Sequence, residues 1–470
     1  MEERERVPGG SERDTERTCH HTYEKLLPGL RDLDALLKGA GVSSVEELFA
    51  DIPPELRIQG CALPDGMAEC ELVEHMRRLL CANKTSRDIL SFLGAGYYRT
   101  YIPAAVKAVT SRSELYTAYT PYQAEASQGM LQALFEFQSM VCELTGMEVT
   151  NTSMYDGPTA LGEAALMAAR ITKKKEIIIP RSLHWEKAEV LRTYARGPGL
   201  RVRELPFDLR TGKTDWSSLK GMLGADTAAV VVSNPNVFGV WEEEAPELRG
   251  IIGDALLIAD VNPLSLGIAR APGDYGADIV VGEGQPLGNP LSFGGPSFGI
   301  LATRKRFVRD MPGRLIGMTR DAEGRRAFCM TLQTREQHIR RAKATSNICS
   351  NEALCAIAAA AYLSVLGRRG LRQLGISLAT KARELARALG RNEGIESPLF
   401  EGSHFNEFVI RSSVSMKSVC AHAARHGILA GVRLRPRYPE LGFSLLVTVS
   451  EAHTREDFER LASVLRGVRE

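Results

Sequence analysis

The sequence predicts an α/β fold in which a large domain with a mostly parallel sheet precedes a smaller C-terminal α/β domain. Three observations predict it. A chain of 470 residues is longer than a single hydrophobic core usually accommodates, and its 44% hydrophobic content is enough to fill a large core. Short β-branched runs alternate with helical stretches along the middle of the chain. We expect a disordered tail at 1–22, a helical segment at 23–90, the large domain at 91–350 and the small domain at 351–470.

The segment after the tail is expected to be helical. Its apolar residues recur at helical spacing and predict one buried stripe, made of Leu33, Leu36, Leu37, Leu72, Met76, Leu79 and Leu80. The tail itself mixes six acids with four arginines in its first 18 residues, so neither a secretory signal nor a transit peptide is expected. Its Cys19-His20-His21 cluster lacks further ligands, and no metal site is expected.

A long amphipathic helix is expected from about Ala124. Its apolar residues repeat at steps of four and three, at Met130, Leu134, Phe137, Val141 and Leu144. Gly146 follows where a C-terminal cap belongs. The buried face of this helix is therefore well specified.

Strands are expected where short apolar runs follow helical stretches. The runs of the large domain are Glu176–Ile179, Val202–Leu205, Ala229–Ser233, Leu256–Asp260 and Asp278–Val281. In the small domain, helices at Glu352–Leu366 and Leu371–Leu389 precede strands at Phe408–Arg411 and Phe443–Val449, which flank another helix. Thr454 and Asp457 are spaced to cap a final helix.

Charge and cysteine usage exclude several classes of protein. The 59 basic and 57 acidic residues nearly cancel, so no nucleic-acid partner is expected. The longest apolar stretch, Ala353–Leu366, is shorter than the roughly 20 residues that cross a bilayer, so no membrane role is expected. The nine cysteines are scattered without a CxxC pair, which favours a cytoplasmic location.

Three long strings carry a resemblance to a known family. They are Tyr116-Thr-Ala-Tyr-Thr-Pro-Tyr-Gln-Ala-Glu-Ala-Ser-Gln-Gly129, Val280–Gly288 followed by Ser292–Pro296, and Thr334–Cys349. With them the chain resembles subunit 1 of the glycine cleavage system P-protein family, over roughly residues 23–465. The resemblance implies an aminotransferase-like large domain, the fold type I class of pyridoxal phosphate enzymes.

The resemblance also implies a function and partners. In this family a cofactor-free subunit pairs with a homologous subunit 2 that binds pyridoxal phosphate. The pair removes the carboxylate of glycine as carbon dioxide and passes the aminomethyl group to the lipoyl arm of H-protein. The expected partners are therefore the second subunit, lipoylated H-protein and glycine.

The residues themselves agree that this chain lacks the cofactor lysine. An imine needs a lysine shortly after the strand that ends near Val281, but no lysine lies between Lys220 and Lys305. Gln285 occupies the expected position, and an amide cannot form the imine. Lys343 is the alternative, in a basic helix-like run.

Other members of a degenerate pocket can be named. Asp260 ends a strand where such folds place the acid that faces the pyridine nitrogen, or it caps the next turn. His184 lies where the ring-stacking residue would be, or it is a packing histidine. Gly157-Pro-Thr159 opens a helix that could hold an anion, or that has no ligand. The Gly282-Glu-Gly284 loop lacks the register of a dinucleotide site, because Pro286 and Pro290 prevent the helix it needs.

The tyrosine-rich string is the stronger candidate for function. Tyr119 and Glu125 are predicted to act in the partner's active site, and Tyr116, Tyr122, Gln123 and Gln128 to face the partner or substrate. The alternative is a polar helix start satisfied by its own backbone. The basic run of Arg335, His338, Arg340, Arg341 and Lys343 is either a solvated helix face or a docking surface, in which His338 and Arg340 would face the partner.

Three functions remain open from the sequence. The leading one is an obligate subunit of glycine decarboxylase, active only with its partner. The second is a regulatory or scaffold paralogue that has lost both cofactor and reaction. The third, an independent pyridoxal phosphate enzyme with an unexpected lysine, is disfavoured by the gap between Lys220 and Lys305.

Overall fold

The computed structural model describes residues 32–58, 66–86 and 88–466. It divides the chain into two compact units, residues 1–83 and 84–470. The expected tail and the Cys19-His20-His21 cluster lie outside the described residues. The domain limits expected near residues 90 and 350 stay predictions.

The first unit is helical, as predicted, with α1 at Leu33–Ala40, α2 at Glu69–Leu80 and 3-10 turns at Val45–Phe49 and Pro54–Leu56. The predicted buried stripe is wrong. None of the described residues between 32 and 83 is buried, and Leu72 and Leu79 are 46% and 55% exposed. The described part of this unit has no strand, so its short helices have no second layer against which to bury their apolar face.

A seven-stranded sheet organises the second unit, in the order β2-β8-β7-β6-β5-β3-β4. The strands are β2 Val149–Thr150, β3 Glu176–Pro180, β4 Arg201–Leu205, β5 Thr227–Asn234, β6 Leu256–Val261, β7 Ile279–Glu283 and β8 Gly299–Thr303. Neighbours from β4 through β7 are parallel, whereas β8 runs antiparallel to β7 and β2. The five predicted strands and the mostly parallel sheet are confirmed.

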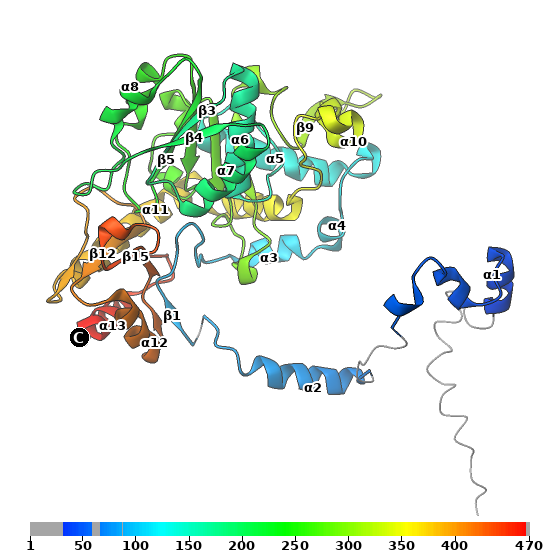
Figure 1. The fold of residues 1–470 in the computed structure, drawn as a ribbon, viewed down its shortest axis with the longest axis horizontal. Coiled ribbons are helices and arrows are strands. Elements are labelled where there is room, and N and C mark those ends of the chain that lie inside the picture. The colour runs from blue at the N-terminus through cyan, green and yellow to red at the C-terminus, as the bar shows by residue number, and fades with distance from the viewer. Residues whose placement is uncertain (1–31, 59–65, 87, 467–470) are drawn as a thin grey trace, which may run out of the picture. The chain divides into compact units, whose positions relative to one another are not determined.

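Helices cover both faces of this sheet (Figure 1). Alternate strand residues point to opposite sides, so Ile178 and Val230 belong to one hydrophobic core and Ile177 and Val231 to the other. The first core is closed by α5 (Gln128–Thr145) and α11 (Ala353–Leu389), and the second by α6 (Gly157–Thr172) and α7 (Trp185–Arg196).

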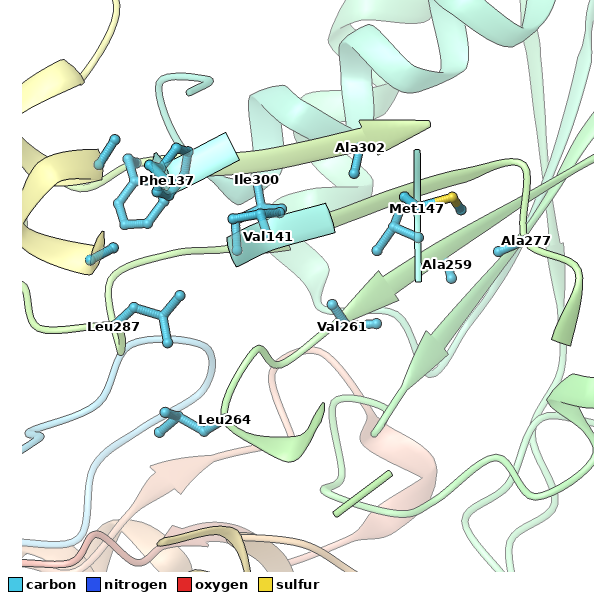
Figure 2. Close-up of a cluster of buried hydrophobic side chains, with 14 of the residues drawn as sticks. Phe137, Val141, Met147, Ala259, Val261, Leu264, Ala277, Leu287, Ile300 and Ala302 are labelled. Atoms are coloured by element: carbon cyan, nitrogen blue, oxygen red, sulfur yellow. The ribbon is translucent and has the colours of Figure 1, made fainter. Parts of the chain in front are cut away.

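The amphipathic helix α5 begins at Gln128 rather than near Ala124, because Ala124–Ala126 form a separate 3-10 turn. Gly146 ends it at φ 68°, as its predicted cap position requires. Figure 2 shows Phe137 and Val141 of this helix near Ile300 of β8, in the core of the first face.

The longest helix, α11, spans Ala353–Leu389 and is interrupted at Gly367, whose φ is 58°. By length and composition alone it is the one helix in the described part of the chain that could cross a membrane. Its packing is that of a core helix, since Ala356 and Ala359 are fully buried and the helix contacts α3 (Ala104–Thr110) and α5.

The C-terminal part forms a four-stranded antiparallel sheet, β11-β12-β15-β14. Its strands β12 (Glu407–Ser412) and β15 (Ser444–Thr448) flank α12 (Met416–Arg425), and α13 (Arg455–Arg466) follows. The predicted cap is confirmed, because the Thr454 nitrogen donates to Asp457 at 2.8 Å. Strand β1 (Leu90–Ser91) pairs with β13 (Ile428–Leu429) and carries Phe92 into this core.

The remaining elements are short. They are α3 Ala104–Thr110, α4 Ser113–Tyr116, α8 Leu219–Met222, α9 Leu248–Ile251, β9 Leu315–Arg320, β10 Arg326–Thr331, α10 Gln337–Arg340, β11 Ile395–Glu396 and β14 Val432–Arg433.

Candidate functional site

The carboxyl ends of the parallel strands meet at one edge of the sheet, where open α/β sheets place their ligands. Ser233 and Asp260 each lie one residue before the end of their strands, β5 and β6, and Glu283 ends β7. All three line one cavity together with His184. The cavity measures about 50 Å³. That is room for a few water molecules.

Asp260 is paired with a lysine that the sequence analysis missed. The Lys187 ammonium lies 2.5 Å from Asp260 Oδ1, and the Ser233 hydroxyl donates to Oδ2 at 2.8 Å. The two charged side chains are only 12% and 3% exposed. Asp260 therefore neither caps the next turn nor presents a free carboxylate. The spacing of the two residues could have indicated this lysine. Lys187 follows His184, the N-cap of α7, by three residues and therefore lies on the same side of the helix.

His184 is a buried packing residue. Its Nδ1 accepts a hydrogen bond from the Glu186 nitrogen at 3.2 Å and so caps α7, while its ring lies 4.3 Å from that of Trp185. Burial, and then the charge of Lys187, lowers the pKa of His184 to about 3. The imidazole is therefore neutral near pH 7, and its buried Nε2 has no hydrogen-bond partner among the described residues.

Gln285 links the pocket to the chain segment that crosses it. Its Oε1 accepts from the Tyr98 nitrogen at 2.8 Å, and its Nε2 donates to the Tyr98 oxygen at 3.0 Å and the Asn289 oxygen at 2.7 Å. The same segment is fixed from the C-terminal sheet, because Glu407 accepts from the Ala95 nitrogen and the Tyr98 hydroxyl, both at 2.7 Å. The buried Gln285 amide thus hydrogen-bonds the main chain of Tyr98 as a neighbouring β-strand would.

The helix start at Gly157 binds a carboxyl group from its own chain. The Gly157 nitrogen donates to Glu283 Oε2 at 2.8 Å, and the same carboxylate accepts from the Gln285 nitrogen at 2.9 Å and from the Ser297 hydroxyl. Burial raises the pKa of Glu283, whereas these three hydrogen bonds favour its charged form. The carboxylate thereby occupies the position at which an external anion would meet α6.

The tyrosine-rich string forms an exposed loop between α4 and α5. Tyr116, Tyr119 and Tyr122 are all exposed, Tyr119 by 74%, and so are Gln123 and Glu125. The Tyr119 hydroxyl hydrogen-bonds to that of Ser350. The alternative of a helix start satisfied by its own backbone holds for Gln128, whose Nε2 donates to the Ala124 oxygen at 2.7 Å.

The loop stands on buried polar residues that sequence reasoning missed. Arg314 is buried and donates to the Thr120 hydroxyl and the Tyr122 hydroxyl, both at 3.0 Å, while its Nε lies 3.6 Å from the carboxylate of buried Glu336. A single arginine before a strand gives no periodic signal that could have marked it.

Gln128 belongs to the support and not to the exposed set. Its Nε2 donates to the Phe328 oxygen at 2.8 Å and its Oε1 accepts from the Phe328 nitrogen at 2.9 Å. The amide therefore pins α5 to strand β10.

The basic run divides into a buried anchor and an exposed remainder. Arg335 is buried and donates to the backbone oxygens of Met311 and Gly313, which neither interpretation from sequence anticipated. His338, Arg340, Arg341 and Lys343 are exposed. The His338 ring lies 5.9 Å from that of Tyr122, edge to face, so the structure brings the basic run and the tyrosine loop onto one surface. Lys343 does not line the pocket.

Comparison with known proteins identifies the family. Residues 25–465 match the family model described as the glycine cleavage system P-protein. The chain belongs to this family. It is 48% identical over 436 residues to the probable glycine dehydrogenase (decarboxylating) subunit 1 of Moorella thermoacetica, covering 92% of this chain and 97% of that protein. The protein of the same description from Thermococcus onnurineus is 48% identical over 446 residues, with coverages of 94% and 99%.

Solved structures agree. A crystal structure of glycine decarboxylase (P-protein) of the glycine cleavage system, in inhibitor-bound form, matches with a TM-score of 0.84 at 40% identity, covering 94% of this chain and 99% of that one. The sphingosine-1-phosphate lyase of Burkholderia pseudomallei matches at 0.62 and 16% identity, over 89% and 93% of the two chains, which shows the fold alone. The aminotransferase-like fold type I class is confirmed.

Pyridoxal phosphate, the cofactor that this fold class implies, does not fit the residues of this P-protein pocket. The acid that would meet the pyridine nitrogen is bound to Lys187, the helix start that would meet the phosphate is bound to Glu283, and an amide stands in place of the imine lysine. These residues therefore supply no step of a reaction that uses pyridoxal phosphate.

Proposed function

We propose that this chain is the cofactor-free subunit of a two-subunit glycine decarboxylase and is active only with the homologous subunit 2. Pyridoxal phosphate is held by that partner, where it supplies the electron sink that decarboxylation needs. The complex passes the aminomethyl group of glycine to the lipoyl arm of H-protein. Family membership over residues 25–465 and the misfit of this chain's own pocket support the proposal.

The tyrosine loop is this chain's contribution to the partner's active site. It joins exposed hydroxyl and carboxylate groups, in Tyr119 and Glu125, to a hydrogen-bonded support made of buried Arg314 and half-buried Gln128. A rigid base under polar side chains is what a catalytic site requires. The Tyr119 hydroxyl and the Glu125 carboxylate contact the reacting glycine, while Tyr116, Tyr122 and Gln123 complete the surface.

The exposed part of the basic run extends the same surface. His338 touches the ring of Tyr122, and Arg340 lies two residues further on. These groups face the partner or an acidic side of H-protein, where charge complementarity sets the rate and orientation of encounter.

Saturated activity tests the role of the loop. The change of Tyr119 to Phe, or of Glu125 to Gln, should leave assembly with subunit 2 intact and lower kcat/KM, a tenfold fall corresponding to about 1.4 kcal/mol. Tyr101→Phe is the matched control, because Tyr101 is also exposed but lies outside the string. Full activity of both string variants at saturating partner would contradict the proposal.

Reconstitution tests the scaffold alternative. The purified chain should be colourless and inactive in glycine–bicarbonate exchange, and activity should appear when subunit 2 is added. If subunit 2 alone reaches the same rate, this chain is a scaffold.

A further inference from the structure

The buried lysine of the pocket has no role in the proposed function. We infer that Lys187 is a built-in occupant of the pocket, a tethered cation that takes the place opposite Asp260 where related folds hold the pyridine ring. This inference concerns the chain's own pocket and stands whether or not Tyr119 and Glu125 reach the partner.

Three separate contacts indicate that side chains of this chain fill the cofactor pocket, and that the Lys187–Asp260 ion pair is one part of this filling. The Lys187 ammonium meets Asp260 at 2.5 Å, Glu283 meets the start of α6 at 2.8 Å, and Gln285 meets Tyr98 at 2.8 and 3.0 Å. Each contact occupies one group that would otherwise bind a different part of a cofactor. These groups are the Asp260 carboxylate, the amides at the start of α6 and the chain segment at Tyr98 over the site. The remaining space is only about 50 Å³.

The alternative, that Lys187 is itself an imine lysine, conflicts with the geometry. The pyridine nitrogen and the carbon that bears the aldehyde lie at opposite ends of the ring. A lysine whose ammonium touches the carboxylate meant for the nitrogen is at the wrong end to reach the aldehyde. Lys187 and Asp260 can therefore bind each other, but cannot both bind one pyridoxal phosphate in its usual orientation.

The pair is also needed for the fold. The Asp260 side chain is 3% exposed, and apart from Lys187 the only side chain among the described residues that donates to it is the Ser233 hydroxyl. A carboxylate so deeply buried needs a compensating charge, because an unpaired ion loses its hydration without any return. Lys187 supplies that charge from the neighbouring helix α7.

Three variants of the full-length chain test the inference by thermal unfolding. Lys187→Met keeps the apolar stem and removes the charge, so it should lower the melting temperature by about 5 °C or more. Adding Asp260→Asn to this variant should recover most of the loss, because the orphaned charge is gone. Lys174→Met is the control, since the Lys174 ammonium pairs at 2.9 Å with a carboxylate, Asp254, that is exposed. An equal loss in Lys187→Met and the control, or no recovery in the double variant, would overturn the inference.

A trapping experiment separates occupant from imine lysine. The wild-type chain without subunit 2 is incubated with pyridoxal phosphate, reduced with borohydride and mapped by mass spectrometry. Lys187 should be no more modified than exposed Lys343. Selective labelling of Lys187, together with a visible imine band that Lys187→Met abolishes, would show a working cofactor site and refute the inference. Neither result depends on the activity of the complex, so the proposed function is tested independently.

Discussion

The side chain of Gln285 acts as a surrogate for backbone, because its amide both accepts from and donates to the main chain of Tyr98. A lysine at this position has three donors and no acceptor. It would leave the Tyr98 N–H buried without a partner, and Lys187 and Glu283 would still hold Asp260 and the start of α6.

We therefore expect Gln285→Lys to lower the free energy of unfolding by about 1–3 kcal/mol, the cost of an unsatisfied buried donor, and to give no visible imine band. Denaturant titration and absorbance after adding pyridoxal phosphate measure the two effects. A variant that is as stable as the wild type and turns yellow would show that this single residue controls cofactor binding.

The neutral state of His184 has a consequence for pH. Its pKa is held at about 3 in the folded chain, against about 6.5 for an ordinary histidine. Between these values the unfolded chain binds the extra proton. The stabilisation is complete above about pH 6.5 and is lost as the pH falls toward 3.

His184→Asn should consequently flatten the dependence of unfolding free energy on pH between 6.5 and 4, where one histidine contributes up to about 1.4 kcal/mol per pH unit. Asparagine can still cap α7. Chemical denaturation at several pH values measures the slope, with the exposed histidine variant His426→Asn as comparison. Parallel curves for wild type and His184→Asn would mean that water reaches the imidazole in the folded protein.

At the scale of elements, the contact between α6 and α7 depends on a missing side chain. A Cβ on Gly162 of α6 would lie 2.8 Å from Cγ of Tyr194 on α7. Such a distance is below van der Waals contact, and both helices are held against the sheet. The helices could accept the methyl group only by moving apart.

Gly162→Ala is expected to destabilise the chain by about 1–3 kcal/mol through overpacking. Gly129→Ala on α5 should instead stabilise it by up to about 1 kcal/mol, because nothing lies within 4 Å of that Cβ and alanine favours the helix. Denaturant midpoints of the two variants should move in opposite directions. Equal shifts would mean that helix propensity, rather than the contact with Tyr194, decides.

The sequence patterns predicted these elements well where burial is local. Five of the seven strands of the large sheet were visible as short apolar runs, and the face of α5 followed from its spacing. The prediction that the apolar stripe in residues 23–83 is buried was wrong, because helical periodicity identifies an apolar face but not the element that covers it. The sequence did not indicate Lys187, because a lysine on an amphipathic helix usually marks the solvated face. Only the position of Asp260 near the end of the neighbouring strand β6 shows that this lysine is buried.

At the scale of the whole molecule, the two compact units differ in how they are stabilised. The four hydrophobic cores are built from residues of the second unit, and no described residue between 32 and 83 is buried. Apolar burial is the main stabilising contribution in folding. The second unit should therefore fold without the first.

A chain beginning at Lys84 should keep the melting temperature and near-ultraviolet circular dichroism of the full-length protein's main transition. Calorimetry of both chains makes the comparison. A markedly lower transition in the shortened chain would mean that residues 1–83 add to the stability of the cores.

The filled pocket also bears on the history of such a two-subunit enzyme. Recovering a cofactor site here requires changes at Lys187, Glu283 and Gln285 together, and each change made alone exposes a buried group that has lost its partner. Every one-step path back therefore passes through a less stable protein. If the partner subunit holds the cofactor, as proposed, selection for folding alone would be enough to keep this chain from regaining a cofactor site.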